Sequence, residues 1–176
     1  TKQTLFDGRF QFNASAFYMT YKNLQVTVID IINGLARTLT RNAPKATSWG
    51  VELEGQARLN RQEPINFGVG YLNAKYDEYV TDDPLLPGLV PEDLSGNRLI
   101  QAPRWSANVG LEYEFALGDI GTLTPSVHVS FKDEAYLREF NKPIDFQQSY
   151  TKTDIVLTYR TTNSRFHLEA FVNNLE

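Results

Sequence analysis

The sequence predicts an all-β fold of antiparallel strands that forms part of the wall of a transmembrane β-barrel. From Trp105 to Phe115, odd positions are apolar or aromatic and even positions are small, polar or acidic. Because successive side chains of a strand point to opposite faces, this segment has one apolar and one polar face. The pattern recurs along the chain, and short connections alternate with long ones. Short turns on one side and long loops on the other are typical of membrane barrels.

Composition sets limits on the remaining classes. The chain has 176 residues, a net charge of -4 and no Cys. A net negative chain without a basic stripe is not expected to bind nucleic acid, because it cannot neutralise phosphates. The lack of Cys removes disulfides and Cys-based metal sites. No apolar stretch approaches the roughly 20 residues of a transmembrane helix, whereas a barrel strand needs only about 9–11 residues.

The first half of the chain contains four strand patterns. Residues 1–6 resemble the end of a strand, and Asp7-Gly8 is a hairpin signal that leads into a strand from Phe10 to about Tyr21. The mixed stretch 22–42 contains Asn33-Gly34 and is interpreted as strand ends that enclose a loop or a hairpin. Apolar alternation returns over 49–59 and, after a short polar connection at 60–64, from Ile65 through Tyr71.

The second half repeats this scheme. A long Pro-, Gly- and Asp-rich connection, 78–101, precedes the strand 105–115, which a turn at 118–121 closes. The next strand covers 123–131, and its Pro125 lacks a ladder donor, which is tolerated near a strand end or at a bulge. A second long connection, 133–148, is followed by strands at 155–159 and 166–172 with a short turn at 161–164. About eight strands are therefore expected.

Two other interpretations remain open from the pattern alone. An amphipathic antiparallel sheet packed on a soluble core also alternates, so a soluble β-sandwich binding module fits single segments equally well. Eight strands would also fit a passive porin or a small complete barrel. The chain starts without a signal sequence and stops at Glu176 directly after a strand pattern, so we expect a fragment of a longer barrel.

Several stretches, taken in order, resemble the C-terminal barrel region of TonB-dependent outer-membrane receptors. The most distinctive is Ser48–Glu54, which is similar to the Gly-Val-Glu-Leu-Glu strand of that family. The resemblance covers nearly the whole chain through the segments Leu5–Arg9, Ala16–Tyr18, Tyr21–Val26, Arg41–Ala43, Ser48–Glu54, Gly70–Tyr76, Leu94–Asn97, Ala102–Arg104 and Phe171–Leu175.

The resemblance implies a 22-stranded barrel in the outer membrane of a Gram-negative bacterium, of which residues 1–176 form a partial barrel domain without the plug domain and the final strand. The implied function is active import of a bulky nutrient such as a ferric siderophore, energised by the TonB system. The implied partners are outer-membrane lipid, a small-molecule ligand and, through the missing N-terminal region, the plug domain and TonB.

Neither enzyme chemistry nor a cofactor is expected. Glu52 with Glu54, and Glu112 with Glu114, place carboxylate pairs on the polar face, where acid–base work or cation binding is formally open; a hydrated wall explains them better. His128, Asp154 and His167 share that face, but their offsets along the strands argue against one metal site. No catalytic, cofactor-binding or metal residue is assigned, and the substrate-binding residues are unknown.

Two sets of side chains remain as candidates for contacts outside the wall. Apolar-face aromatics near strand ends are expected to form an interfacial girdle: Trp49, Tyr71, Trp105, Tyr113, Phe115, Phe131, Tyr159 and Phe166. Loops held by a rigid wall are where binding usually resides. The long connections and adjoining strand ends hold these polar and aromatic candidates: Lys75, Tyr76, Tyr79, Asp82, Asp83, Arg98, Arg104, Arg138, Glu139 and Lys142.

Overall fold

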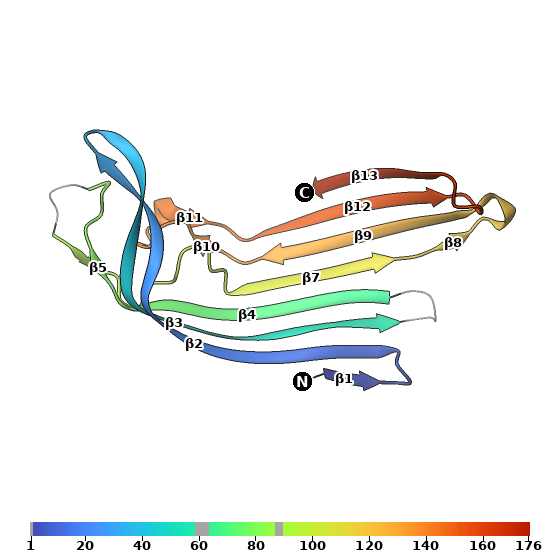
Figure 1. Ribbon diagram of the computed structural model, residues 1–176, viewed down its shortest axis with the longest axis horizontal. Helices are drawn as coiled ribbons and strands as arrows, with labels where there is room; N and C mark the ends of the chain where they lie inside the picture. Colours follow the sequence, from blue (N-terminus) through green and yellow to red (C-terminus); the bar gives the residue numbers. More distant parts are fainter. Residues whose placement is uncertain (1, 59–63, 87–89) are drawn as a thin grey trace.

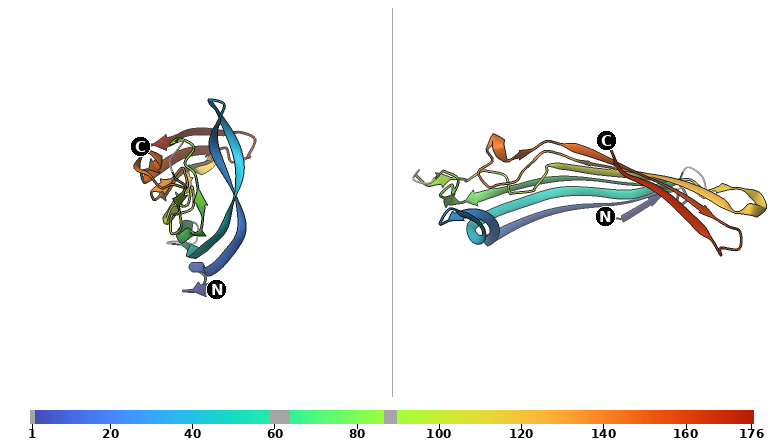
Figure 2. Two further views of the ribbon diagram at one scale, coloured as in Figure 1. Left: turned by 90° about the vertical axis from the view of Figure 1, so that its left-hand side faces the viewer. Right: turned by 90° about the horizontal axis from the view of Figure 1, so that it is seen from above.

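The structure, a computed structural model, describes residues 2–58, 64–86 and 90–176, with the backbone alone at 28–31, 36 and 64. It is an open, curved antiparallel sheet with short accessory elements at one end (Figures 1 and 2). The main strands are β1 (Lys2–Leu5), β2 (Phe10–Ile32), β3 (Leu35–Arg58), β4 (Pro64–Glu78), β7 (Trp105–Glu112), β8 (Phe115–Ala116), β9 (Thr122–Lys132), β12 (Tyr150–Arg160) and β13 (His167–Leu175).

The all-β antiparallel prediction is confirmed. Each main strand pairs with its neighbour in the chain, in the order β1-β2-β3-β4-β7-β9-β12-β13, and β8 pairs with β9 in line with β7. The described sheet thus has eight rows of strand, as the alternation predicts. Among these described residues, no helix is long and apolar enough to cross a membrane.

Residues 22–42 form the far part of a long β2–β3 hairpin, so the hairpin interpretation of this stretch is correct. Asn33 and Gly34 have φ of 54° and 77°, which a two-residue hairpin turn requires at both central positions. The pairing runs without a register shift from Phe10↔Ala57 to Ile32↔Leu35. Both strands are longer than predicted because alternation ends where the hairpin passes beyond the amphipathic part of the sheet.

The strand predicted over 105–115 is interrupted, which is a correction. β7 ends at Glu112 and β8 starts at Phe115, although the register with β9 is the same on both sides of the gap. The Tyr113 N–H donates to the Pro125 carbonyl at 3.1 Å. A closely paired antiparallel couple exchanges two such bonds, and Pro125 has no N–H to return the second. The missing donor therefore breaks the ladder locally.

The register confirms one apolar and one polar face across the sheet. The apolar residues of one strand lie opposite those of the next, as in Leu53↔Val69 and Val69↔Ala107. Polar residues pair in the same way, as in Asp154↔His128. Because a shift by one residue would exchange the two faces, this agreement over eight rows fixes the assignment.

Short and long connections lie at opposite ends of the sheet (Figure 1). At one end, Phe6–Arg9, the 3-10 turn Gly118–Ile120 and the turn 161–164 join neighbouring strands. At the other end, the long connections contain β5 (Val80–Thr81), β6 (Glu92–Asp93), β10 (Ala135–Tyr136), the 3-10 turn Pro143–Asp145 and β11 (Phe146–Gln147). The predicted connection at 60–64 lies largely outside the described residues, as do positions 87–89 of the first long connection.

Buried apolar side chains gather under the long connections rather than within the wall. The cluster comprises Val26, Ala43, Ala46, Tyr76, Tyr79, Leu94 and Phe140. By contrast, wall residues such as Leu53 and Leu111 are 36% and 48% exposed. The long connections thus have a small core of their own, which fixes them on the end of the sheet.

Candidate functional site

The four polar-face glutamates do not form one site. Glu54 accepts a hydrogen bond from Asn13 Nδ2, and Glu52 accepts one from Ser15 Oγ, both at 3.3 Å. Glu52 lies in the row that continues through Gly70 and Ser106, whereas Glu112 is six residues farther along β7. At about 3.3 Å per residue the two pairs are roughly 20 Å apart. Both pairs are exposed and belong to a polar wall rather than to a catalytic centre.

The His/Asp/His row is also separated. His128 is directly opposite Asp154, but His167 is opposite Arg160, six residues along β12. Asp154 Oδ1 accepts the Asn174 N–H at 2.9 Å. In the part of the chain that the structure describes, no group of three His, Asp or Glu side chains is close enough to hold a metal ion.

The apolar-face aromatics lie at two levels of the wall. Near the long connections, the Trp49 and Tyr71 rings are 5.4 Å apart and the Tyr71 and Trp105 rings 4.9 Å apart. Near the short turns, the Tyr113 and Phe115 rings are 4.3 Å apart. Phe131 lies at the first level, and Tyr159 and Phe166 lie at the second. Their role as an interfacial girdle stays a prediction.

Many of the candidates from the long connections are not free to bind a ligand. Lys75, Asp82 and Arg104 are partly or fully exposed. Five of the ten candidates are buried: Tyr76, Tyr79, Asp83, Arg98 and Glu139. These five candidates for ligand binding are therefore engaged in contacts within the long connections.

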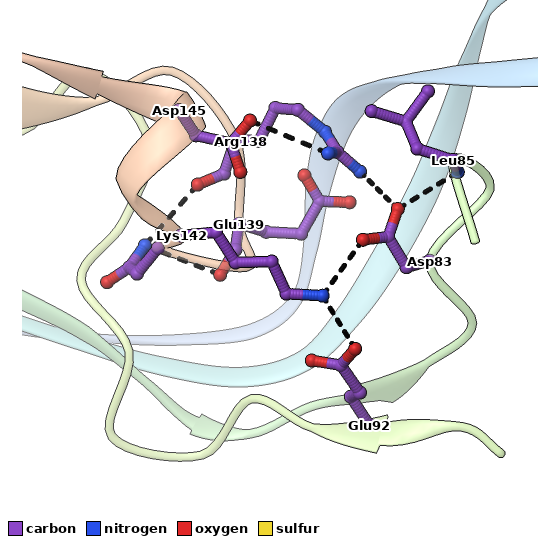
Figure 3. Close-up of polar contacts among 8 residues, drawn as sticks. Asp83, Leu85, Glu92, Arg138, Glu139, Lys142 and Asp145 are labelled. Carbon is purple, nitrogen blue, oxygen red and sulfur yellow. Dashed lines mark hydrogen bonds and ion pairs between the residues drawn. The ribbon is translucent and has the colours of Figure 1, made fainter. Parts of the chain in front are cut away.

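Asp83 is the centre of an ion-pair cluster that joins the two long connections (Figure 3). We call Asp83, Glu92, Arg138, Lys142 and Asp145 the loop cluster. Asp83 Oδ1 contacts Arg138 Nη2 at 2.6 Å, and Asp83 Oδ2 contacts Lys142 Nζ at 3.0 Å. Lys142 Nζ also reaches Glu92 Oε1 at 2.7 Å, and Arg138 Nη1 reaches Asp145 Oδ1 at 3.5 Å. Both cations lie about 5 Å from the centre of the Phe140 ring.

A second link joins the same connections through backbone groups. Asn141 Oδ1 accepts the Arg98 N–H at 2.7 Å, and Asn141 Nδ2 donates to the Arg98 carbonyl at 3.1 Å. The Arg98 guanidinium donates to the Glu134 carbonyl at 2.8 Å. Two independent sets of contacts therefore hold the long connections together.

Burial and pairing shift the carboxyl pKa values in opposite directions. Burial alone raises the pKa of Asp83, but hydrogen bonds from Arg138, the Leu85 N–H and Lys142 outweigh it and hold the pKa below its usual range. The pKa of Glu139 is raised, mainly because this side chain is buried, against the attraction of Arg138. Ionised Asp83 therefore stabilises the folded connections, whereas ionisation of Glu139 destabilises them.

The Asp83 shift predicts acid sensitivity of the long connections. A depressed folded pKa contributes stability that is present above the ordinary value of 3.8 and is lost as pH falls through the folded pKa. In the intact receptor, spin labels at the exposed positions Val90 and Ile144 should report a single distance at neutral pH and a distribution that broadens progressively as the pH falls below 3.8. Asp83→Asn should be broad at both pH values. An unchanged wild-type distribution in acid would contradict the prediction.

The sequence missed three residues that complete these contacts: Glu92, Asp145 and Asn141. Nothing local marks Glu92, because its partner Lys142 is 50 positions away. Asp145 is the last residue of the short 3-10 turn Pro143–Asp145, and nothing local marks Arg138, seven positions away, as its partner. A positive φ of 53° at Asn141 fits the known tolerance of Asn for this region, but it does not reveal a contact with Arg98.

A hollow of about 650 Å³ lies between the β2–β3 hairpin and the long connections. Its apolar lining includes Leu24, Val26 and Leu137, and its polar lining includes Gln101 and Glu139. A concave, mostly apolar site with a few polar groups is the usual form of a small-molecule pocket.

Comparison with solved structures identifies the fold. The chain is similar to the ferric yersiniabactin uptake receptor FyuA of Yersinia pestis, with TM-score 0.71 and 23% identity over 95% of this chain and 22% of that chain. It is also similar to the siderophore receptor PiuA of Acinetobacter baumannii, with TM-score 0.70 and 20% identity over 98% of this chain and 23% of that chain. For BauA, the ferric preacinetobactin receptor of the same organism, the TM-score is 0.67 and the identity 18%, over 97% and 23%.

The chain thus spans less than a quarter of each of these structures. A search of curated protein sequences gives no match. The family model described as TonB dependent receptor-like, beta-barrel matches residues 1–175. The strands have one apolar and one polar face, and short and long connections lie at opposite ends of the sheet. Because the family model also matches nearly the whole length, the chain belongs to the β-barrel family of TonB-dependent receptors.

Proposed function

We propose that this chain is a segment of the wall of an outer-membrane receptor that imports a bulky nutrient such as a ferric siderophore. The observation that carries the proposal is that the chain matches the receptor family and forms a sheet with one apolar and one polar face. The three similar structures are receptors for ferric yersiniabactin, a siderophore and ferric preacinetobactin, which favours this ligand class.

The chain is proposed to act as part of a larger barrel in a Gram-negative outer membrane. It covers 22% or 23% of the similar receptors, which supports a partial barrel domain rather than a complete one. The apolar face would contact lipid, and the polar face around Glu52 and Glu54 would contact a plug domain. Transport would depend on TonB through regions beyond this segment, and the segment itself would have no catalytic role.

Ligand capture is proposed at the end of the wall that bears the long connections. The hollow lined by Leu24, Val26, Leu137 and Glu139 offers an apolar surface with polar groups. The loop cluster would hold this surface in place, because its ion pairs join the two connections that border the hollow. The charged residues would thus shape the site more than they contact the ligand.

Uptake by the intact receptor tests this function. An iron-starved Gram-negative host that lacks its own siderophore receptors should take up radiolabelled ferric siderophore only when the receptor is present, and not when TonB is deleted. Uptake that persists without TonB would favour a passive porin. Recovery of the receptor in the aqueous fraction without detergent would favour a soluble β-sandwich module, and either result would overturn the proposal.

A further inference from the structure

A row of outward-facing aromatic residues marks one level of the wall close to the long connections. Tyr18 is opposite Trp49, and the rings of Trp49, Tyr71 and Trp105 follow one another across β3, β4 and β7. Tyr18, Trp49 and Trp105 are 71%, 41% and 49% exposed. Tyr and Trp side chains in such a row are typical of the level at which lipid headgroups meet the acyl chains.

Three lysines lie on the same face, just past this row. On β3, Lys45 and Thr47 are four and two residues from Trp49 and so point to the same face as Trp49. Lys75 is directly opposite Thr47. Lys22 is directly opposite Lys45 on β2. The other face of β3 at this level is covered, because Ala46 and Ser48 are buried. The three side chains therefore share the face that carries the aromatic row.

The pairing of Lys22 with Lys45 is electrostatically unfavourable. Directly opposite residues of an antiparallel pair have Cβ atoms about 4.5–5.5 Å apart, and like charges there are destabilising. Glu78 is the register partner of Lys45 on its other side. Within the described part of the chain, however, no carboxylate is within ion-pair distance of the ammonium groups of Lys22, Lys45 or Lys75.

This arrangement contrasts with the cations of the long connections. Arg98, Arg138 and Lys142 all have carboxylate partners. These three cations are thus neutralised where the connections pack together, whereas the three lysines beside the aromatic row have no ion-pair partner among the described residues. An anion supplied from outside the chain would relieve the repulsion between them.

A groove of about 660 Å³ provides room for such an anion. Its lining includes Tyr18, Thr20, Lys45, Thr47, Lys75 and Asp77. The Asp77 carboxylate also lines the groove; it accepts the Thr47 hydroxyl at 2.6 Å and makes no ion pair with Lys75 among the described residues. Because Thr47 donates to Asp77, the ammonium groups of Lys45 and Lys75 are the charged donors of the groove, and ammonium donors are suited to a phosphate group.

We propose that Lys22, Lys45 and Lys75 form a docking site for the phosphate headgroup of an anionic membrane lipid. The proposal rests on the proposed membrane function, because the aromatic row then fixes the depth of the site at the headgroup level. At that depth a lipid phosphate is within reach of all three lysines, and its acyl chains lie along the apolar face below Trp49. Lysines near an anionic membrane surface each contribute about 1 kcal/mol of attraction.

Native mass spectrometry of the intact receptor in neutral detergent tests the site, with dioleoyl phosphatidic acid and dioleoyl phosphatidylcholine as competing probes. Wild type should retain phosphatidic acid selectively, and K45Q/K75Q should bind it about 30-fold more weakly, because each lysine contributes about 1 kcal/mol of attraction. The matched control K132Q/K152Q removes two lysines from the polar face and should bind like wild type. K45R/K75R keeps the charge and should also retain the lipid.

Equal retention by K45Q/K75Q and wild type, an equal loss in the control, or equal binding of phosphatidylcholine would overturn the site. Displacement of the lipid by inorganic phosphate at equal concentration would also overturn it, since the groove would then recognise free phosphate. Incorporation of each variant into phosphatidylcholine vesicles is measured first. Failure of wild type to incorporate would reject the membrane function itself, whereas incorporation without selective lipid binding would reject this inference alone.

Discussion

Val127→Arg is expected to prevent assembly of the intact receptor into a bilayer. Val127 is in the middle of β9, on the apolar face, opposite Leu111 of β7 and Ile155 of β12. An Arg on the lipid face of a barrel costs about 2–4 kcal/mol at the bilayer midplane, because the guanidinium loses its water there. Folding into phosphatidylcholine vesicles, followed by the change in electrophoretic mobility on heating, measures the loss.

His128→Arg is the matched control for this change. His128 is the next residue along β9, is exposed on the polar face and is directly opposite Asp154. The same new side chain would remain in water and could pair with Asp154, so assembly should be near that of wild type. Equal damage by both substitutions, or by neither, would show that the apolar face is not the lipid face.

Asp83→Asn is expected to release the two long connections from each other. The Asp83 side chain is 3% exposed and is the shared partner of Arg138 and Lys142. Removing one partner of a buried ion pair leaves cations uncompensated and costs on the order of 3 kcal/mol. That energy raises the opened fraction more than roughly 100-fold. Trypsin cleavage after Arg138, measured on the folded receptor at neutral pH, should accelerate accordingly.

The neighbouring Asp82→Asn substitution controls for the loss of a charge. Asp82 is exposed and makes no ion pair with any residue that the structure describes. Cleavage after Arg138 should therefore stay at the wild-type rate in this variant. If Asp83→Asn is cleaved no faster than Asp82→Asn, the loop cluster does not hold the connections together.

The sequence predicted the wall well because the relevant signal is local. Alternation at Trp105–Glu112 is decided by whether each side chain meets an apolar or a polar surface, and the period of a strand is the same everywhere. The Asn33-Gly34 turn was readable for a similar reason, since few residues adopt positive φ at both positions. The break after Glu112 was not readable, because it depends on Pro125 of the next strand.

The site at the long connections was less predictable. The sequence marked Asp83, Arg138 and Lys142 as exposed candidates, whereas the structure pairs them across 55 and 59 positions. No periodicity links residues so far apart, because their contact depends on how two irregular segments pack. The same packing buries Tyr76 and Glu139 and shapes the hollow beside them.

By itself, then, the sequence determined the all-β class, the two faces of the wall and the order of turns and long connections, because each follows from neighbours within a few residues. Only the tertiary structure decided which charges are paired. It neutralised Arg138 and Lys142 with Asp83, and it placed Lys22 opposite Lys45 with no ion pair to either lysine among the described residues. Charge pairing depends on distance in space, and strand pairing sets that distance between residues far apart in the chain.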